Sequence, residues 1–208
     1  MCRMPIKKKG VQLVLASLSP RRKELIAKLG LPFRTVPSRV AEKKKPGESP
    51  SSLVRRLSVA KARYVAKKLK NSYCLVVGAD TVVVLKDRIF GKPLSHGDAA
   101  RMLLKLSGRV HKVFTGIAVA HPQSGKVRSA VAVTKVKFRR LSRKEAARIG
   151  KKHMDKSGSY AFQDREDRVV EKVQGDWQTV VGLPLAVLRR LLRPFMVSKV
   201  EPKDSGPF

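Results

Sequence analysis

A single carboxylate interrupts a run of strand-forming residues in the first half of this sequence. Residues 76–84 read Val-Val-Gly-Ala-Asp-Thr-Val-Val-Val, with Asp80 at the centre. A strand this apolar is normally buried on both faces, and an ionised carboxylate there costs free energy unless a metal, a cation or a reaction uses the charge. Asp80 is therefore a candidate general base or metal ligand, because both roles need such a charge.

Three other charged side chains are candidate partners of this aspartate. Glu42, one acid before a lysine-rich loop, is a candidate second ligand for Mg²⁺ or Mn²⁺; its alternative role is a surface ion pair with Lys43 or Lys44. Lys61, between two alanines, and Lys92, after a glycine in a turn, are candidate point charges for a phosphate. Because lysine is abundant, a solvent-facing side chain is a strong alternative for each.

Two arginines begin a helix at a place where acidic residues are favoured. Ser19 is suited to cap the helix, Pro20 to its first position, and Arg21 and Arg22 follow. The helix N-terminus carries partial positive charge, so an anion would resolve this conflict. Backbone N–H groups, the hydroxyls of Ser17 and Ser19 and the two guanidinium groups predict a phosphate-binding turn. Two arginines that point to solvent are an equally weighted alternative.

The composition indicates a globular chain with an unusual charge. It has 208 residues, 42% of them hydrophobic, with 47 Lys and Arg against 15 Asp and Glu, a formal net charge of +32. Such a field attracts polyanions, and weak nucleic-acid binding is expected from it. The basic residues are dispersed, which favours a general surface adaptation over a dedicated nucleic-acid stripe. No apolar run is long enough to cross a membrane.

Cysteine usage and missing motifs narrow the possible chemistry. Cys2 and Cys74 cannot build a disulfide framework, and a reducing cytoplasm is the simplest location. The sequence has no P-loop, dinucleotide fingerprint or CxxC, and its four histidines show no metal spacing. Ser17 and Ser19 have no nearby histidine, which argues against a Ser-His-Asp hydrolase.

The hydrophobic pattern predicts an α/β protein with a mixed sheet. A basic extension is expected at residues 1–10, one domain at 11–195 and a flexible tail at 196–208. The first helix is expected to run from Pro20 to a stop at Gly30. Strands are expected at 11–15, 33–36, 75–85, 89–93, 110–120, 127–141, 158–162 and 169–173, and further helices at 53–69, 98–106, 142–149 and 185–192.

Several separate blocks of the chain fall, in order, on the motifs of one family. They cover residues 15–25, 29–33, 60–62, 78–83, 91–93, 102–108, 155–158, 160–163 and 175–185. Together they resemble the Maf family of nucleotide pyrophosphatases. The resemblance implies hydrolysis of nucleoside triphosphates to monophosphate and pyrophosphate, which clears non-standard nucleotides from the pool. It also implies a divalent cation, an elongated mixed sheet flanked by helices with two lobes around a cleft, as in ITPase-like proteins, frequent homodimers and an older association with septum formation.

The resemblance also implies roles for single residues. Asp80 matches the proton acceptor of the family, and Glu42, Lys61 and Lys92 match its other charged active-site positions. The metal ligands expected from the residues themselves remain Asp80 and Glu42. The phosphate-binding turn corresponds to the segment that begins at Ser17.

Substrate choice is implied by three further matches. Arg21, Thr81 and Gln163 fall on the positions that separate the substrate classes, and Arg with Gln resembles the type that acts on dTTP and UTP. The chain departs from the family after Gln163, where residues 164–168 replace a glycine-rich turn. The net charge and this loop leave one alternative, a non-catalytic protein that binds polyanions such as nucleic acid on a Maf-like scaffold.

Overall fold

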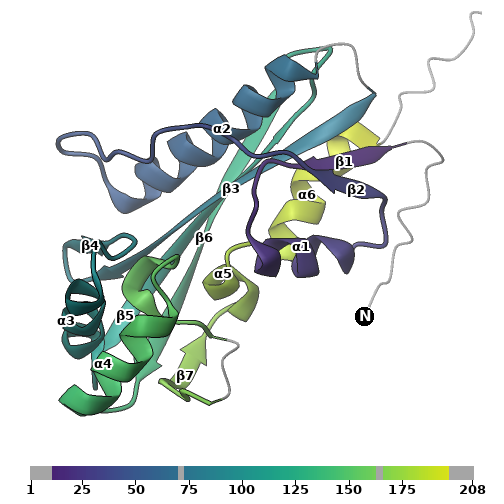
Figure 1. Cartoon of the computed structure of the whole chain (residues 1–208). Coiled ribbons are helices and arrows are strands. Elements are labelled where there is room, and N and C mark those ends of the chain that lie inside the picture. The colour runs from purple at the N-terminus through teal and green to yellow at the C-terminus, as the bar shows by residue number, and fades with distance from the viewer. Residues whose placement is uncertain (1–10, 70–72, 163–165, 197–208) are drawn as a thin grey trace, which may run out of the picture.

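A seven-stranded mixed sheet forms the centre of the protein (Figure 1). The computed structural model describes residues 11–69, 73–162 and 166–196. The strand order is β2-β1-β3-β5-β6-β7, with β4 also paired to β3. The strands are β1 Gln12–Leu15, β2 Phe33–Thr35, β3 Cys74–Leu85, β4 Arg88–Phe90, β5 Val110–Ala120, β6 Val127–Phe138 and β7 Val170–Gln174. β1 pairs in parallel with β2 and β3, and the other pairs are antiparallel.

Six α-helices of the described residues cover this sheet. They are α1 Pro20–Ala27, α2 Pro50–Lys68, α3 His96–Leu106, α4 Arg143–Lys152, α5 Trp177–Val181 and α6 Leu185–Met196. In Figure 1, α2 lies along the length of β3 and β5, whereas α1, α5 and α6 gather near one end of the sheet and α3 and α4 near the other. None of the helices in the described residues is long and apolar enough to span a membrane.

The side chains of β3 alternate between separate cores, as a strand buried on both faces requires. Val76 packs in one core with Ala62 of α2. Val77 points to the opposite face and shares a second core with α1 and α6. Val83 belongs to a third core, which α3, α4 and β4 complete. The predicted α/β fold, with an elongated mixed sheet and two lobes around a cleft, is confirmed.

Two sequence-based element assignments are wrong. The expected strand at 158–162 is a 3₁₀ turn, η1 Ser157–Ser159, followed by irregular chain. Gly158 has φ +74° and Ser159 has φ +58°, and this left-handed backbone cannot continue as a strand. The sequence pattern also missed α5, whose five residues are too few to show a helical period. The expected extension at 1–10 and residues 197–208 of the expected tail lie outside the described residues.

Candidate active-site cleft

Along one edge of β3, none of the described strands lies beside the middle of the strand. On that edge β1 pairs with residues 74–77 and β4 with residues 83–85, which leaves residues 78–82 between them. Two side chains take the place of the missing strand: Arg22 donates to the carbonyl oxygen of Ala79 at 3.0 Å, and Ser157 donates to that of Thr81 at 3.0 Å. These bonds satisfy backbone acceptors that would otherwise be orphaned.

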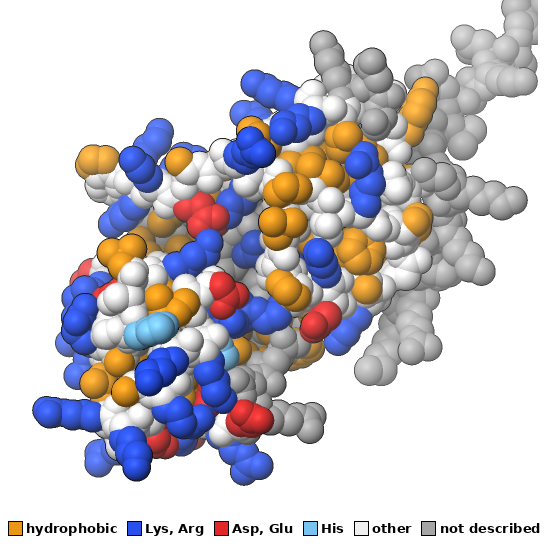
Figure 2. Space-filling view, in the orientation of Figure 1, with side chains coloured by type: hydrophobic (Ala, Val, Ile, Leu, Met, Phe, Trp, Pro, Cys, Tyr) orange, Lys and Arg blue, Asp and Glu red, His pale blue; other side chains and the backbone are white. Residues whose placement is uncertain are grey.

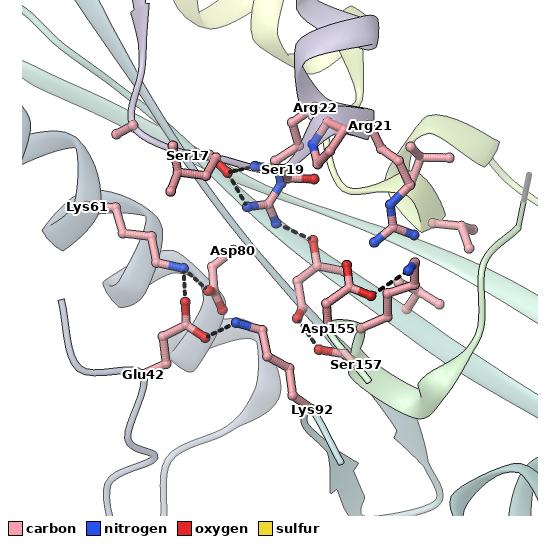
Figure 3. A pocket seen from close by; sticks show the side chains of 18 of the residues that line it. Ser17, Ser19, Arg21, Arg22, Glu42, Lys61, Asp80, Lys92, Asp155 and Ser157 are labelled. Carbon is pink, nitrogen blue, oxygen red and sulfur yellow. Dashed lines mark hydrogen bonds and ion pairs between the residues drawn. The ribbon is translucent and has the colours of Figure 1, made fainter. Parts of the chain in front are cut away.

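A cleft of about 420 Å³ opens at this gap in the sheet (Figure 3). Every site residue predicted from the sequence within the described ranges lines it: Ser17, Ser19, Arg21, Arg22, Glu42, Lys61, Asp80, Thr81 and Lys92. Figure 3 shows Lys61 and Glu42 facing Asp80, with the arginines of α1 across the cleft. Gln163, the remaining predicted residue, lies outside the described residues.

Two glycines bring α2 close enough to the sheet to supply Lys61. A Cβ added at Gly78 would lie 2.2 Å from a backbone oxygen of α2, and one at Gly116 would lie 2.1 Å from another. Asp80 lies two residues beyond Gly78, on the same face of β3, and is paired in register with Gly116. The close approach of helix and sheet therefore occurs beside the aspartate.

Asp80 and Glu42 share one lysine. The Nζ atom of Lys61 lies 2.6 Å from Asp80 Oδ1 and 2.6 Å from Glu42 Oε1. Lys92 lies 3.3 Å from the other oxygen of Glu42. Asp80 is only 5% exposed and Lys61 only 6%, so a buried carboxylate is compensated by a buried ammonium. The costly charge noted in the strand thus has a cationic partner.

The two carboxylates have different proton affinities. Burial raises the pKa of Asp80, and the cations of Lys61 and Arg22 offset only part of that rise. Burial also opposes ionisation of Glu42, but Lys61 and Lys92 outweigh it and hold the pKa of Glu42 below its usual range. Environments that separate the pKa values of two carboxylates assign them different roles. Asp80 is suited to accept a proton, and Glu42 to remain charged.

The two arginines of α1 also differ. Arg22 gives hydrogen bonds to the carbonyl oxygens of Gly182 and Ala79 at 3.0 Å each, to Thr81 Oγ1 at 3.1 Å and to Ser17 Oγ at 3.4 Å. Its guanidinium therefore joins α1, β3 and the end of α5. Arg21 lines the same cleft but makes no hydrogen bond within the described part of the chain. Arg21 is the arginine whose donors remain available to an anion.

The side chain of Ser17, and not that of the N-cap residue Ser19, supports the shape of this turn. Ser19 occupies the N-cap position of α1, as predicted, but its side chain makes no capping hydrogen bond. Ser17 Oγ instead accepts from the backbone N–H of Ser19 at 3.2 Å.

Asp80 and Glu42 each place one carboxylate oxygen 2.6 Å from the Nζ atom of Lys61, so both acids face the same part of the cleft. No cluster of three or more potential metal-ligating side chains occurs in residues 11–69, 73–162 and 166–196. Mg²⁺ commonly takes one or two carboxylates and completes its shell with water and substrate phosphates. The donor set therefore fits a divalent cation that a phosphate ligand helps to hold.

Sequence reasoning gave no role to one wall of the cleft. Asp155, Lys156, Ser157 and Tyr160 line it, and Asp155 pairs with Lys156. Burial opposes ionisation of Asp155, yet Lys156 holds its pKa below the usual value. These residues lie in a block that resembles the family motifs, so the signal was present without an assigned role.

Comparison with known proteins gives matches over most of the chain. The family described as Maf-like protein matches residues 12–195. A dTTP/UTP pyrophosphatase of Moorella thermoacetica is 46% identical over 89% of this chain and 96% of its own length. A dTTP/UTP pyrophosphatase of Acetivibrio thermocellus is 44% identical over 90% of this chain and 97% of its own length. The solved structure of the Staphylococcus aureus Ham1 protein shares the fold, with a TM-score of 0.52 at 11% identity, over 88% of this chain and 99% of that one.

Proposed function

Because this chain belongs to the Maf family, we propose that it hydrolyses nucleoside triphosphates, dTTP and UTP among them, to the monophosphate and pyrophosphate. The observation that carries the proposal is that a buried carboxylate and an arginine line the same cleft. One wall holds a buried carboxylate with a raised pKa, Asp80, and the other presents the guanidinium of Arg21, which makes no hydrogen bond with the described residues. A base facing cations is the arrangement that phosphoanhydride hydrolysis requires.

The reaction is attack of water on the α-phosphorus. Asp80 accepts one proton of the water while the oxygen of that water bonds to the α-phosphorus. At the same time the bond from the α-phosphorus to the bridging oxygen of the leaving pyrophosphate breaks. Negative charge moves onto that bridging oxygen. Lys61, Lys92 and Arg21 line the cleft where this charge develops, and they stabilise it.

A divalent cation belongs to the same proposal. Asp80 and Glu42 would hold it, because both carboxylates line the cleft beside Lys61 and the low pKa of Glu42 keeps that carboxylate charged. Bound there with the triphosphate, Mg²⁺ or Mn²⁺ would supply charge neutralisation and polarise a phosphoryl oxygen.

The base preference is supported by the names of the relatives and by two predicted specificity residues in the cleft. Arg21 and Thr81 both line it. Thr81 Oγ1 accepts from Arg22 and shares a 2.9 Å hydrogen bond with Thr115 Oγ1, so its orientation is fixed. Gln163 offers a donor and an acceptor, which suits the mixed edge of uracil or thymine.

A panel of nucleoside triphosphates tests the proposal. Purified protein with Mg²⁺ or Mn²⁺ should release pyrophosphate from dTTP and UTP faster than from ATP, GTP and CTP. Asp80→Asn should reduce the rate by at least about a hundredfold, because a positioned base contributes roughly 10²–10⁴. Asp176→Asn is a matched control, since Asp176 caps α5 outside the cleft lining. Equal turnover by Asp80→Asn and wild type would refute the role of Asp80, and no release from any triphosphate would refute the activity.

The location of the protein in the cell and its oligomeric state are both proposals. The buried thiol of Cys74, 3% exposed, suits a reducing cytoplasm. A homodimer, as the family resemblance implies, is tested by the molar mass of the purified protein in solution.

A further inference from the structure

A second hollow in the surface is lined mainly by cations. Its walls include Lys86 and Arg88 around the β3–β4 turn, Lys105 of α3 and Arg109 before β5. Asp87 is the one acid among the described residues that line it. It shares no lining residue with the active-site cleft. Four basic groups and one acid thus surround a space of about 700 Å³.

These four cations are not neutralised within the described part of the protein. All four side chains are exposed, and none makes an ion pair with a described carboxylate. Arg88 lies 5.6 Å from the centre of the buried Phe90 ring, which holds the guanidinium over an apolar floor. Like charges that converge without a counter-ion repel one another, so an anion that bridges them lowers the free energy of this surface.

The surroundings extend the same charge. Figure 2 shows that Lys and Arg outnumber acidic side chains on the visible surface around α3 and α4. Residues 139–152 contain seven Lys and Arg and one acid, Glu145; Arg139, Arg148 and Lys152 pair with acids, and four cations remain. A ligand in the hollow would therefore meet cations beyond its rim. This favours a long ligand with charges in series over a single small anion.

We propose that this basic hollow, defined by Lys86, Arg88, Lys105 and Arg109, binds the phosphate backbone of a single-stranded nucleic acid. The side chains would contact successive phosphates, and they carry no base-reading groups fixed in position, so binding should not depend on sequence. This inference goes beyond the proposed function, because it needs no turnover in the cleft.

The net charge of +32 predicts some weak binding of nucleic acid anywhere on the surface. The test must therefore distinguish the effect of the position of the cations from the effect of the total charge. The hollow variant replaces its four cations by glutamine. The control variant removes the same number of lysines and arginines from exposed positions outside the hollow, again without ion pairs to described residues: Arg63, Lys67, Lys126 and Arg189, each to Gln. Both variants therefore have the same net charge.

Binding of a fluorescent 20-nucleotide RNA is measured by anisotropy between 50 and 300 mM NaCl. The hollow variant should bind more than tenfold more weakly than wild type at 100 mM. Its slope of log K against log salt should fall by about 3, since each phosphate contact on a single strand contributes about 0.7. The control variant should lose less than threefold. Equal losses in the two variants, or no binding by wild type at 50 mM, would overturn the proposal.

Two further measurements distinguish this proposal from the binding of small phosphate compounds and from the hydrolytic activity. Inorganic triphosphate is the other ligand with phosphates in series. It should displace the RNA only when its phosphate concentration is at least tenfold higher than the phosphate concentration of the RNA. Displacement at equal phosphate concentrations would overturn the proposal that the hollow binds a nucleic-acid backbone. Pyrophosphate release is assayed in parallel and should be unchanged in the hollow variant, so failure of the hydrolytic proposal shows in a different readout.

Discussion

Asp80 and Glu42 are both carboxylates beside the same ammonium, yet they are not equivalent. The difference arises from burial, because Asp80 is nearly inaccessible whereas the Glu42 side chain is 42% exposed. Lys92 adds a second cation on the Glu42 side only. Chemistry at this site therefore depends on the environment of each acid more than on its type.

The raised pKa of Asp80 has a direct kinetic consequence. Asp80 must be deprotonated to accept a proton, so activity should fall as the pH falls, with a midpoint above the value of about 3.9 for a free aspartate. The charge of Glu42 contributes to the rise, so Glu42→Gln should move that midpoint to lower pH. The measurement is kcat against pH for wild type and variant at saturating substrate. A midpoint that moves to higher pH in Glu42→Gln would contradict this account.

Arg21 and Arg22 should respond differently to the same substitution. Arg22→Lys loses several bonds to buried acceptors and should cost roughly 2–4 kcal/mol of unfolding free energy, seen as a lower Tm. Arg21→Lys should leave the Tm within about 1 °C of wild type but raise KM or lower kcat, because one ammonium cannot replace a fork of donors. Thermal unfolding and steady-state kinetics are measured on both. Equal Tm values would show that Arg22 is not structural.

The sequence was sufficient to predict which residues form the site, but not which role each of them has. Asp80 was conspicuous because a charge in an apolar strand needs a reason. Nothing in the sequence distinguishes Arg21 from Arg22, since their roles depend on the edge carbonyls of β3 and on Gly182, 160 residues from Arg22 in the chain. Asp155 lies in a block that resembles the family motifs, but only the structure shows that this block lines the same cleft as Asp80.

Among the elements, α2 and β3 have the most constrained contact. Gly78→Ala would place a methyl group within 2.2 Å of a helix oxygen, so α2 must move outward. Overpacking of this kind costs roughly 1–3 kcal/mol, and at this chain length each kcal/mol lowers the Tm by about 2–4 °C. Activity should fall further than stability, because Lys61 moves away from Asp80 with its helix.

Thermal unfolding and kcat of Gly78→Ala test this expectation. Gly47→Ala is a suitable control for a glycine change, because a Cβ there meets nothing within 4 Å, although its φ of +67° carries some backbone strain. Full activity of Gly78→Ala at a temperature where it is folded would show that the helix can retreat without loss of the site.

Long elements were predictable because their periodicity is strong. The twelve residues of β3 and the nineteen of α2 carry clear patterns, and the structure begins each within a few residues of the expected start. The errors at 158–162 and at α5 fall where the chain crosses the cleft. There the backbone is set by contacts such as that between Ser157 and the edge of β3, which no local pattern contains.

At the scale of the whole molecule, the net charge of +32 opposes folding. Self-repulsion of this size destabilises the compact state, and salt screens it because the Debye length falls from about 30 Å at 0.01 M to about 8 Å at 0.15 M. The Tm should therefore rise with NaCl over this range, by about 2–4 °C for each kcal/mol of repulsion removed. Differential scanning calorimetry in NaCl and KCl measures it. A Tm that stays constant or falls in both salts would contradict the expectation.

Lys61 and Lys92 already balance the charges of Asp80 and Glu42 before any ligand arrives. Folding therefore does not depend on a divalent cation, unlike in proteins whose clustered carboxylates repel one another when the metal is removed. Preparation in EDTA should neither unfold nor precipitate this protein, and the chelated stock should regain full turnover as soon as magnesium and nucleotide are added together. The same two lysines leave free magnesium little charge to bind, so the metal would enter the catalytic cycle as the magnesium–nucleotide complex.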